Sequence, residues 1–160
     1  MIVAPVPSHE SARLDALHQY RILDTPSEAV FDELASLAAY VCRAPIAVIS
    51  FIGATRQWFK SVVGLPYLET PRSTAFCAHT ILGKDLFIVE EADTDARFQD
   101  PPWVIEPPAV RFYAGVPLLT DDGHAIGSLA VMDVVPRSLT PEHRAAMQRR
   151  AWHVMAQCAL

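Results

Sequence analysis

The first third of the chain has apolar residues at helical spacing. Residues 9–23 predict a short amphipathic helix, with Ser8 as a candidate cap. The segment Thr25-Pro26-Ser27-Glu28 predicts a capping box, because Thr25 would cap, the proline suits a first helical position and Glu28 would reach back to the cap nitrogen. Apolar positions between Phe31 and Val41 continue this second helix, and Pro45 marks its end.

The middle of the chain changes to the patterns of strands and turns. Residues 46–52 (IAVISFI) are almost continuously apolar, which is typical of a strand covered on both faces in the middle of a sheet. Residues 56–63 (RQWFKSVV) predict the returning strand of a hairpin, nearer an edge. We expect irregular chain over 64–72, a brief helix over 73–82 and a short strand over 86–90.

The last part of the chain predicts a lid, a second hairpin and a final helix. The connection 91–110 contains four prolines and is long for a compact domain, so we interpret it as a functional lid. Strands over 111–120 and 124–133 are joined by Asp121-Asp122-Gly123, a strong turn signal. Thr140-Pro141-Glu142 opens a helix over 140–160. The element order predicts one α+β domain, residues 1–160, with antiparallel strands and a flexible segment 1–8.

Composition narrows the classes of function. The net charge is −5 and the 13 Lys and Arg residues are scattered, so no basic stripe favours nucleic acid. No apolar run approaches the roughly 20 residues of a membrane span. Three cysteines without CxxC spacing fit a reducing compartment, and we expect a cytoplasmic protein.

Short phrases along nearly the whole chain are similar to one family. They are ILDTP (22–26), RQWFK (56–60), TPR (70–72), FCAHTIL (76–82), DARF (95–98), RFYAGVPL (111–118), the glycine pattern from Gly123 to Leu129, and PRSLT (136–140). The chain resembles the bacterial GAF domains attached to histidine kinases and diguanylate cyclases. The resemblance implies a GAF/PAS-like central antiparallel sheet of five to six strands, with N- and C-terminal helices packed on one face. It also implies a ligand pocket between the other face and the crossover loops, and a kinase or cyclase output domain as a partner.

Cys77 and His79 are the candidates for reactive chemistry. A neighbouring imidazolium can lower the pKa of a thiol and make it a nucleophile or redox sensor. Residues i and i+2 of a helix point about 200° apart, however, so we favour a buried cysteine and a hydrogen-bonded histidine. His79 has no second metal ligand at a recognisable spacing, and we expect no metal and no cofactor.

Arginines and aromatic residues flank the expected pocket. Arg72, Arg97 and Arg111 are candidates for clamping an anion, or for internal ion pairs with Glu69, Asp93, Asp95 or Asp133 that hold the crossover loops. Trp103, isolated between two proline pairs, is the aromatic residue that we expect to close over a cavity. The candidate ligand-binding residues are Arg72, Phe76, Cys77, His79, Phe98, Trp103, Arg111, Tyr113 and Asp133.

Three functions remain open on the sequence. The first is a non-catalytic sensor of an unknown small molecule, in which the ligand orders the 91–110 lid and the terminal helices respond. The second is a thiol-dependent redox enzyme or redox sensor of the free methionine sulfoxide reductase type, although the strand that begins at 111 lacks the second cysteine which that chemistry needs. The third is a homodimerisation module that pairs through the first and last helices.

Overall fold

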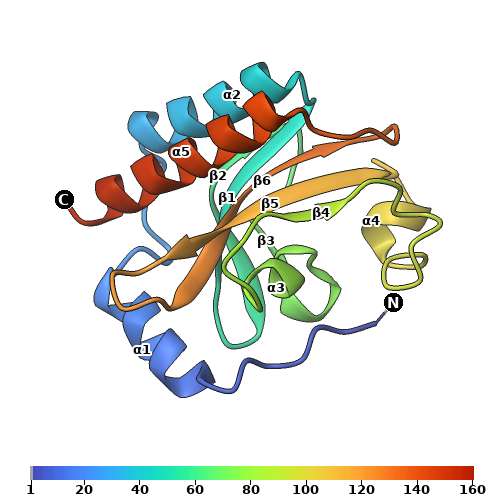
Figure 1. Cartoon of the computed structure of the whole chain (residues 1–160). Coiled ribbons are helices and arrows are strands. Elements are labelled where there is room, and N and C mark those ends of the chain that lie inside the picture. The colour runs from blue at the N-terminus through green and yellow to red at the C-terminus, as the bar shows by residue number, and fades with distance from the viewer. Residues whose placement is uncertain (1) are drawn as a thin grey trace.

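A computed structural model describes the fold of residues 2–160 (Figure 1). Its helices are α1 (Glu10–Gln19), α2 (Ala29–Cys42), α3 (Cys77–Thr80), α4 (Pro102–Ile105) and α5 (Pro141–Cys158), with a 3₁₀ turn at Arg72–Thr74. Its strands are β1 (Ile46–Ile52), β2 (Arg56–Val63), β3 (Glu69–Pro71), β4 (Phe87–Val89), β5 (Phe112–Leu119) and β6 (Ala125–Asp133). No helix within residues 2–160 is long and apolar enough to cross a membrane.

The six strands form one antiparallel sheet in the order β3-β2-β1-β6-β5-β4. Both expected hairpins are confirmed, and β1 lies in the middle of the sheet as its apolar run predicted. Two hairpins that are distant in sequence meet where β1 pairs with β6, with Val48 opposite Ala130. This register is what aligns side chains from both halves of the chain on one sheet face.

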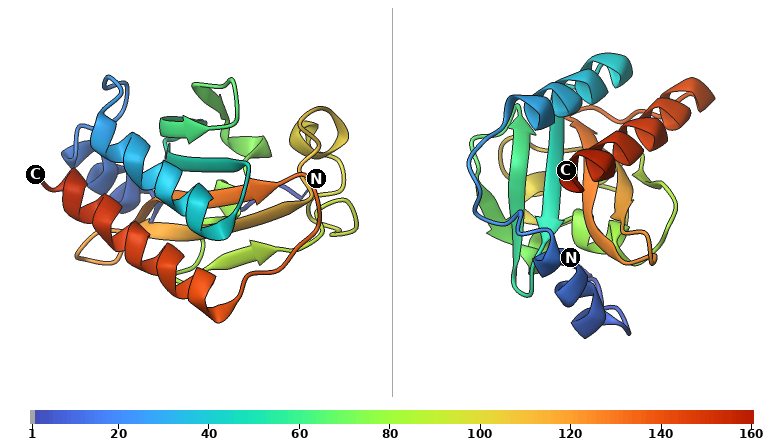
Figure 2. Two further views of the ribbon diagram at one scale, coloured as in Figure 1. Left: turned by 90° about the horizontal axis from the view of Figure 1, so that it is seen from above. Right: turned by 90° about the vertical axis from the view of Figure 1, so that its left-hand side faces the viewer.

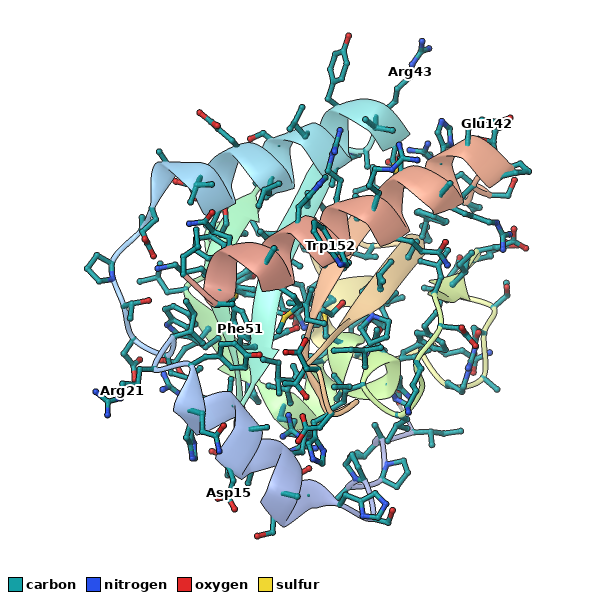
Figure 3. The ribbon with its side chains drawn as sticks, turned by 60° about the vertical axis from the view of Figure 1, so that its left-hand side comes forward. Asp15, Arg21, Arg43, Phe51, Glu142 and Trp152 are labelled. Atoms are coloured by element: carbon teal, nitrogen blue, oxygen red, sulfur yellow. The ribbon has the colours of Figure 1, made fainter. Side chains whose placement is uncertain are left out.

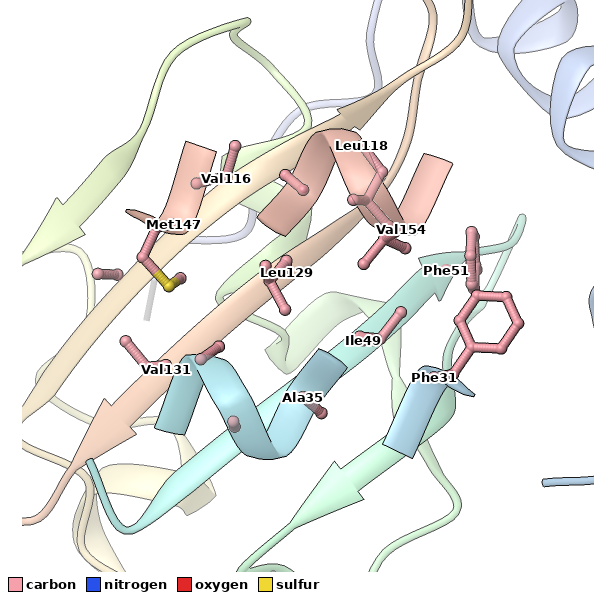
Figure 4. Close-up of a cluster of buried hydrophobic side chains, with 14 of the residues drawn as sticks. Phe31, Ala35, Ile49, Phe51, Val116, Leu118, Leu129, Val131, Met147 and Val154 are labelled. Atoms are coloured by element: carbon pink, nitrogen blue, oxygen red, sulfur yellow. The ribbon is translucent and has the colours of Figure 1, made fainter. Parts of the chain in front are cut away.

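Helices α2 and α5 run antiparallel to each other over one face of the sheet (Figures 1 and 2). Alternate strand residues such as Ile49 and Leu129 point to this face because side chains of a strand alternate between faces. They pack with Ala35 of α2 and with Met147 and Val154 of α5 in a buried cluster (Figure 4). The apolar positions expected between Phe31 and Val41 of α2 are therefore confirmed as its buried face.

The opposite face of the sheet is covered by α3, the 3₁₀ turn and the connection 91–110, which contains α4. Phe76, Phe98, Trp103 and Val110 come from these covering segments and are all buried. Tyr113 rises from β5 into the same cluster and is fully buried. The two faces thus have separate cores, one under helices and one under irregular chain.

Two helix caps differ from the sequence prediction. The N-cap of α2 is Glu28 and not Thr25, and α1 begins after His9 without a cap from Ser8. The Thr25 hydroxyl instead donates to Ile22 O and accepts from Lys60 Nζ, whose ammonium also pairs with Glu28 at 2.6 Å. Lys60 is buried, and a buried ammonium group requires oxygen partners. The Thr25 hydroxyl and the Glu28 carboxylate bind Lys60 and therefore do not form the capping box.

Several boundaries also change. Residues 64–72, expected to be irregular, contain the edge strand β3, and the helix expected over 73–82 shrinks to α3. The helix expected over 9–23 ends at Gln19. Residues 1–8 were expected to be flexible; in the described part of this segment, Ile2 N donates to Arg97 O and Ile2 O lies 3.0 Å from His79 Nε2.

Candidate functional site

A small buried cavity lies between the sheet and the connection 91–110. Strands β1, β2, β5 and β6 supply its floor, while α3 and α4 cover it. Its lining residues are Val48, Gln57, Phe59, Phe76, Cys77, Trp103, Tyr113 and Met132. The free volume is about 10 Å³, which is room for about one water molecule. Four of the nine candidate ligand-binding residues line it, namely Phe76, Cys77, Trp103 and Tyr113.

The Tyr113 hydroxyl is the centre of a buried polar cluster beside the cavity. It lies 2.7 Å from Thr80 Oγ1 and 3.3 Å from Ser128 Oγ, and it donates to Cys77 Sγ at 3.2 Å. The ring reaches this place because Gly115, two residues along β5, has no side chain. A Cβ at Gly115 would lie 2.2 Å from the Tyr113 oxygen. Burial raises the pKa of Tyr113 well above its ordinary value, so the hydroxyl stays protonated.

Cys77 is a buried thiol without a base. Burial raises the pKa of Cys77, and its contacts with Ser50, Tyr113 and Ser128 only partly offset this. A protonated thiol is a poor nucleophile. Cys42 belongs to the core on the helix side of the sheet and Cys158 packs against that core, so neither thiol shares the cavity with Cys77.

His79 and Cys77 have different partners, which agrees with the helical spacing. The Nε2 of His79 lies 3.0 Å from Ile2 O, and the His79 ring packs edge-on against Phe98 with centroids 4.8 Å apart. Burial lowers the pKa of His79, with Arg97 adding to the effect and the contact with Ile2 O opposing it. Phe98 lies behind Phe76 and does not line the cavity, since the two rings meet edge-on at 4.6 Å.

The three candidate arginines form internal ion pairs. Arg72 binds Glu10 of α1 at 2.6 Å and donates to Gly53 O, so its partner is not one of the four acidic residues proposed from the sequence. Arg97 pairs with Asp95 at 2.8 Å.

Arg111 donates to Val104 O at 2.9 Å and lies 3.4 Å from Asp93. Asp133 accepts from Arg137 at 3.0 Å and from Val134 N. Arg72, Arg111 and Asp133 therefore stabilise loops at the edge of the fold and do not line the cavity.

Four lining residues, Val48, Gln57, Phe59 and Met132, were not among the candidate ligand-binding residues, and Gln57 is the polar one of the four. Its side chain is 4% exposed, and Nε2 donates to Thr70 Oγ1 at 3.0 Å. Its Oε1 has no hydrogen-bond partner among the described protein atoms. Strand alternation from Phe59, which shares the face with Gln57, was the signal that would have placed it.

Within residues 2–160 no group of three or more His, Cys, Asp or Glu side chains is arranged to hold a metal ion. The chemistry available at the cavity is therefore hydrogen bonding and apolar contact. The relevant polar atoms are Gln57 Oε1 and the Cys77 thiol, since the Tyr113 hydroxyl already has three partners.

Comparison with known families agrees with this architecture. The family model for the GAF domain matches residues 26–157. The chain belongs to the GAF domain family. A cyclic di-GMP phosphodiesterase of Pseudomonas aeruginosa is 42% identical over 147 residues, which cover 92% of this chain and 25% of that protein. The chain thus spans about a quarter of the length of this relative.

Two solved GAF structures share the fold at low sequence identity. The GAF domain from an Acinetobacter phosphoenolpyruvate-protein phosphotransferase superposes with a TM-score of 0.68 at 15% identity, covering 92% of this chain and 93% of that one. A GAF sensor protein from Burkholderia vietnamiensis gives 0.64 at 19% identity, covering 93% and 97%. The GAF fold expected from the sequence motifs is confirmed, with α2 and α5 packed on one face of a six-stranded antiparallel sheet.

Proposed function

We propose that this GAF domain is a non-catalytic sensory domain that binds a small molecule between the sheet and the connection 91–110, and that it acts in bacterial signal transduction in the cytoplasm. The observation that carries the proposal is the buried cavity lined by Gln57, whose Oε1 has no hydrogen-bond partner in the described part of the chain. Burying an unpaired acceptor costs free energy that a bound ligand recovers. An acceptor kept at a cavity wall therefore favours binding over a purely structural role.

The thiol-dependent alternative receives no support from the site. That chemistry needs a thiolate and a second thiol to resolve the oxidised intermediate. Burial raises the pKa of Cys77, and the other two cysteines belong to the opposite side of the sheet. A binding role for Cys77, through its side-chain surface, is the simpler assignment.

The signal would leave the cavity through the segment that precedes α3. Phe76 and Cys77 line the cavity, and Arg72, four residues before Phe76, binds Glu10 of α1. Glu10 also pairs with the buried Arg13, which donates to Ile52 O at the end of β1. A ligand that shifts the 72–77 segment therefore changes how α1 is held, provided that it binds one arrangement better than the other.

The output of this signal is an enzyme of nucleotide second-messenger turnover or a kinase. The relative from Pseudomonas aeruginosa is named a cyclic di-GMP phosphodiesterase, and this chain aligns with a quarter of it. Regulation of such a phosphodiesterase, kinase or cyclase output domain is the partnership that we propose for this chain.

Native mass spectrometry of gently purified protein tests the proposal. We expect a fraction of the chain to retain one small molecule, which is released on denaturation and is lost from the Trp103→Ala variant. If the chain always appears at its bare mass, and no member of a metabolite library raises its melting temperature, the sensory proposal is wrong.

A second candidate function is homodimerisation through the helix layer. Tyr40 of α2 is 81% exposed and Trp152 of α5 is 68% exposed, and Figure 3 shows Trp152 on the outer side of α5. Large aromatic side chains on an exposed helix face are typical of interfaces. Helix α2 also exposes Leu37, whereas α1 exposes no large apolar side chain, so we propose that α5 pairs together with α2 and not with α1.

Sedimentation velocity at several concentrations tests the dimer. We expect association that weakens in Tyr40→Glu and Trp152→Glu but not in Leu68→Glu, a control at an exposed apolar residue outside the helix layer. A monomer at every concentration would contradict the proposal.

A further inference from the structure

Among the residues that the structure describes, no Lys, Arg or His side chain lines the cavity. None of the eight lining residues is ionised at neutral pH, because the Cys77 thiol and the Tyr113 hydroxyl are protonated. The guanidinium groups of Arg72, Arg97 and Arg111 are each taken up by a carboxylate of this chain. A buried anion without a counter-charge is strongly unfavourable. The surroundings therefore select against phosphates and carboxylates.

Gln57 supplies one directional polar contact. Its Nε2 donates to Thr70, and its Oε1 is an acceptor without a partner among residues 2–160. A single water molecule is a poor partner for it, since buried water needs two to four polar contacts and the Tyr113 hydroxyl is already saturated. The partner that suits Oε1 is an N–H or O–H donor on an otherwise apolar molecule.

Space for such a molecule lies on the other side of Trp103. An outer groove of about 220 Å³ is lined by Tyr67, Thr70, Pro71, Thr74, Pro102, Trp103, Glu106 and Pro107. Trp103 lines both the groove and the inner cavity, and Thr70, the partner of Gln57, lines the groove.

The indole ring of Trp103 is therefore the partition between groove and cavity. Trp103 belongs to the short helix α4 of the connection 91–110. Its ring packs edge-on against the ring of Tyr67, with centroids 5.0 Å apart. A cavity of about 150 Å³ is enough to hold benzene. The groove and the cavity together therefore have space for a molecule of one or two rings. The Glu106 carboxylate at the groove further disfavours anions.

We propose that the domain binds a neutral, flat molecule of one or two rings that carries a single hydrogen-bond donor. The molecule enters from the outer groove as Trp103 moves aside, and its donor binds Gln57 Oε1. This assignment rests on the proposed sensory function and adds the chemical class of its ligand.

Three probes of nearly equal shape test the class in NMR titrations of the whole chain. Indole is neutral and has one N–H, 1-methylindole lacks the donor, and indole-3-carboxylate keeps the donor but adds a charge. We expect indole to shift the Trp103 and Gln57 side-chain resonances and to bind about five- to tenfold more tightly than 1-methylindole. Indole-3-carboxylate should bind more weakly than either.

The variant Gln57→Met removes the amide at similar volume. In this variant we expect indole and 1-methylindole to bind equally, whereas Gln148→Met, a matched change at an exposed glutamine of α5, should keep the wild-type difference. Equal binding of the two probes to the wild type, or preference for the carboxylate, would overturn the ligand class while leaving the sensory function standing. Absence of binding by all three at millimolar concentration would also overturn it. The sensory function itself is tested separately, by native mass spectrometry and by the effect of the metabolite library on the melting temperature.

Discussion

Replacing Gln57 by methionine in the ligand-free protein shows how the Gln57 side chain affects folding stability, apart from its proposed role in binding a ligand. The change removes an unsatisfied buried acceptor, worth about 1–3 kcal/mol, and one hydrogen bond to Thr70, worth about 0.5–1.5 kcal/mol. Thr70 is partly exposed and can bind water instead. Methionine has a similar length and suits a wall that contains Phe59 and Trp103. We expect a net gain of about 1 kcal/mol in the free energy of unfolding.

Urea denaturation measures this gain as a higher midpoint at an unchanged slope. For a chain of this size, 1 kcal/mol corresponds to a melting temperature about 2–4 °C higher. Gln148→Met on the surface is the control and should change stability by less than about 0.5 kcal/mol. A loss of more than about 1 kcal/mol in Gln57→Met would refute the reasoning, because it would mean that Oε1 is satisfied in the free protein.

Three further predictions concern the same region. Gly115→Ala should lower the free energy of unfolding by about 1–3 kcal/mol in urea denaturation, because the new Cβ would clash with the Tyr113 hydroxyl. Gly83→Ala is the control and should be nearly neutral, because the space around Gly83 is open. Equal effects of the two substitutions would contradict the packing argument. Burial raises the pKa of Glu10, but the hydrogen bonds and charges of Arg13 and Arg72 outweigh this effect and lower the pKa from 4.5 to about 2. The Glu10 carboxylate therefore stabilises the fold fully above pH 4.5, and this stabilisation is lost as the pH falls towards 2. Denaturation at pH 6 and pH 3 should show a smaller pH dependence in Glu10→Gln, and an unchanged pH dependence would speak against the pairing. Iodoacetamide at pH 8 should alkylate Cys77 only after unfolding in urea, since burial raises the pKa of this thiol, and rapid labelling of the folded chain would revive the redox alternative.

Local patterns were enough to predict the sheet and the helices that cover one face. The apolar run 46–52 and the turn Asp121-Asp122-Gly123 each depend on neighbours in sequence, and both predictions were confirmed. The strand β3 was missed because three residues that include a proline have no periodicity to detect. The cap at Thr25 failed because its hydroxyl is used by Lys60, 35 residues further on.

The candidate site divides in the same way. The residue types of Phe76, Cys77, Trp103 and Tyr113 mark buried positions, and these four residues line the cavity, whereas Phe98 is buried but does not line it. The sequence did not reveal Glu10 as the partner of Arg72. Glu10 is 62 residues away, and no sequence motif shows where its helix packs against the rest of the chain. Gln57 looked like one polar residue of a mixed strand until the sheet showed which face it shares with Phe59.

The strand order has a practical use. Strands β1 to β3 and strands β4 to β6 are two contiguous blocks of chain, which are joined in the sheet by the pairing of β1 with β6. A polypeptide cut within 82–86, between α3 and β4, would leave each block whole, with α1 and α2 on one piece and α5 on the other. Co-expressed halves should then reassemble by the pairing of β1 with β6, which makes the domain a candidate scaffold for a split reporter whose recombination responds to a ligand.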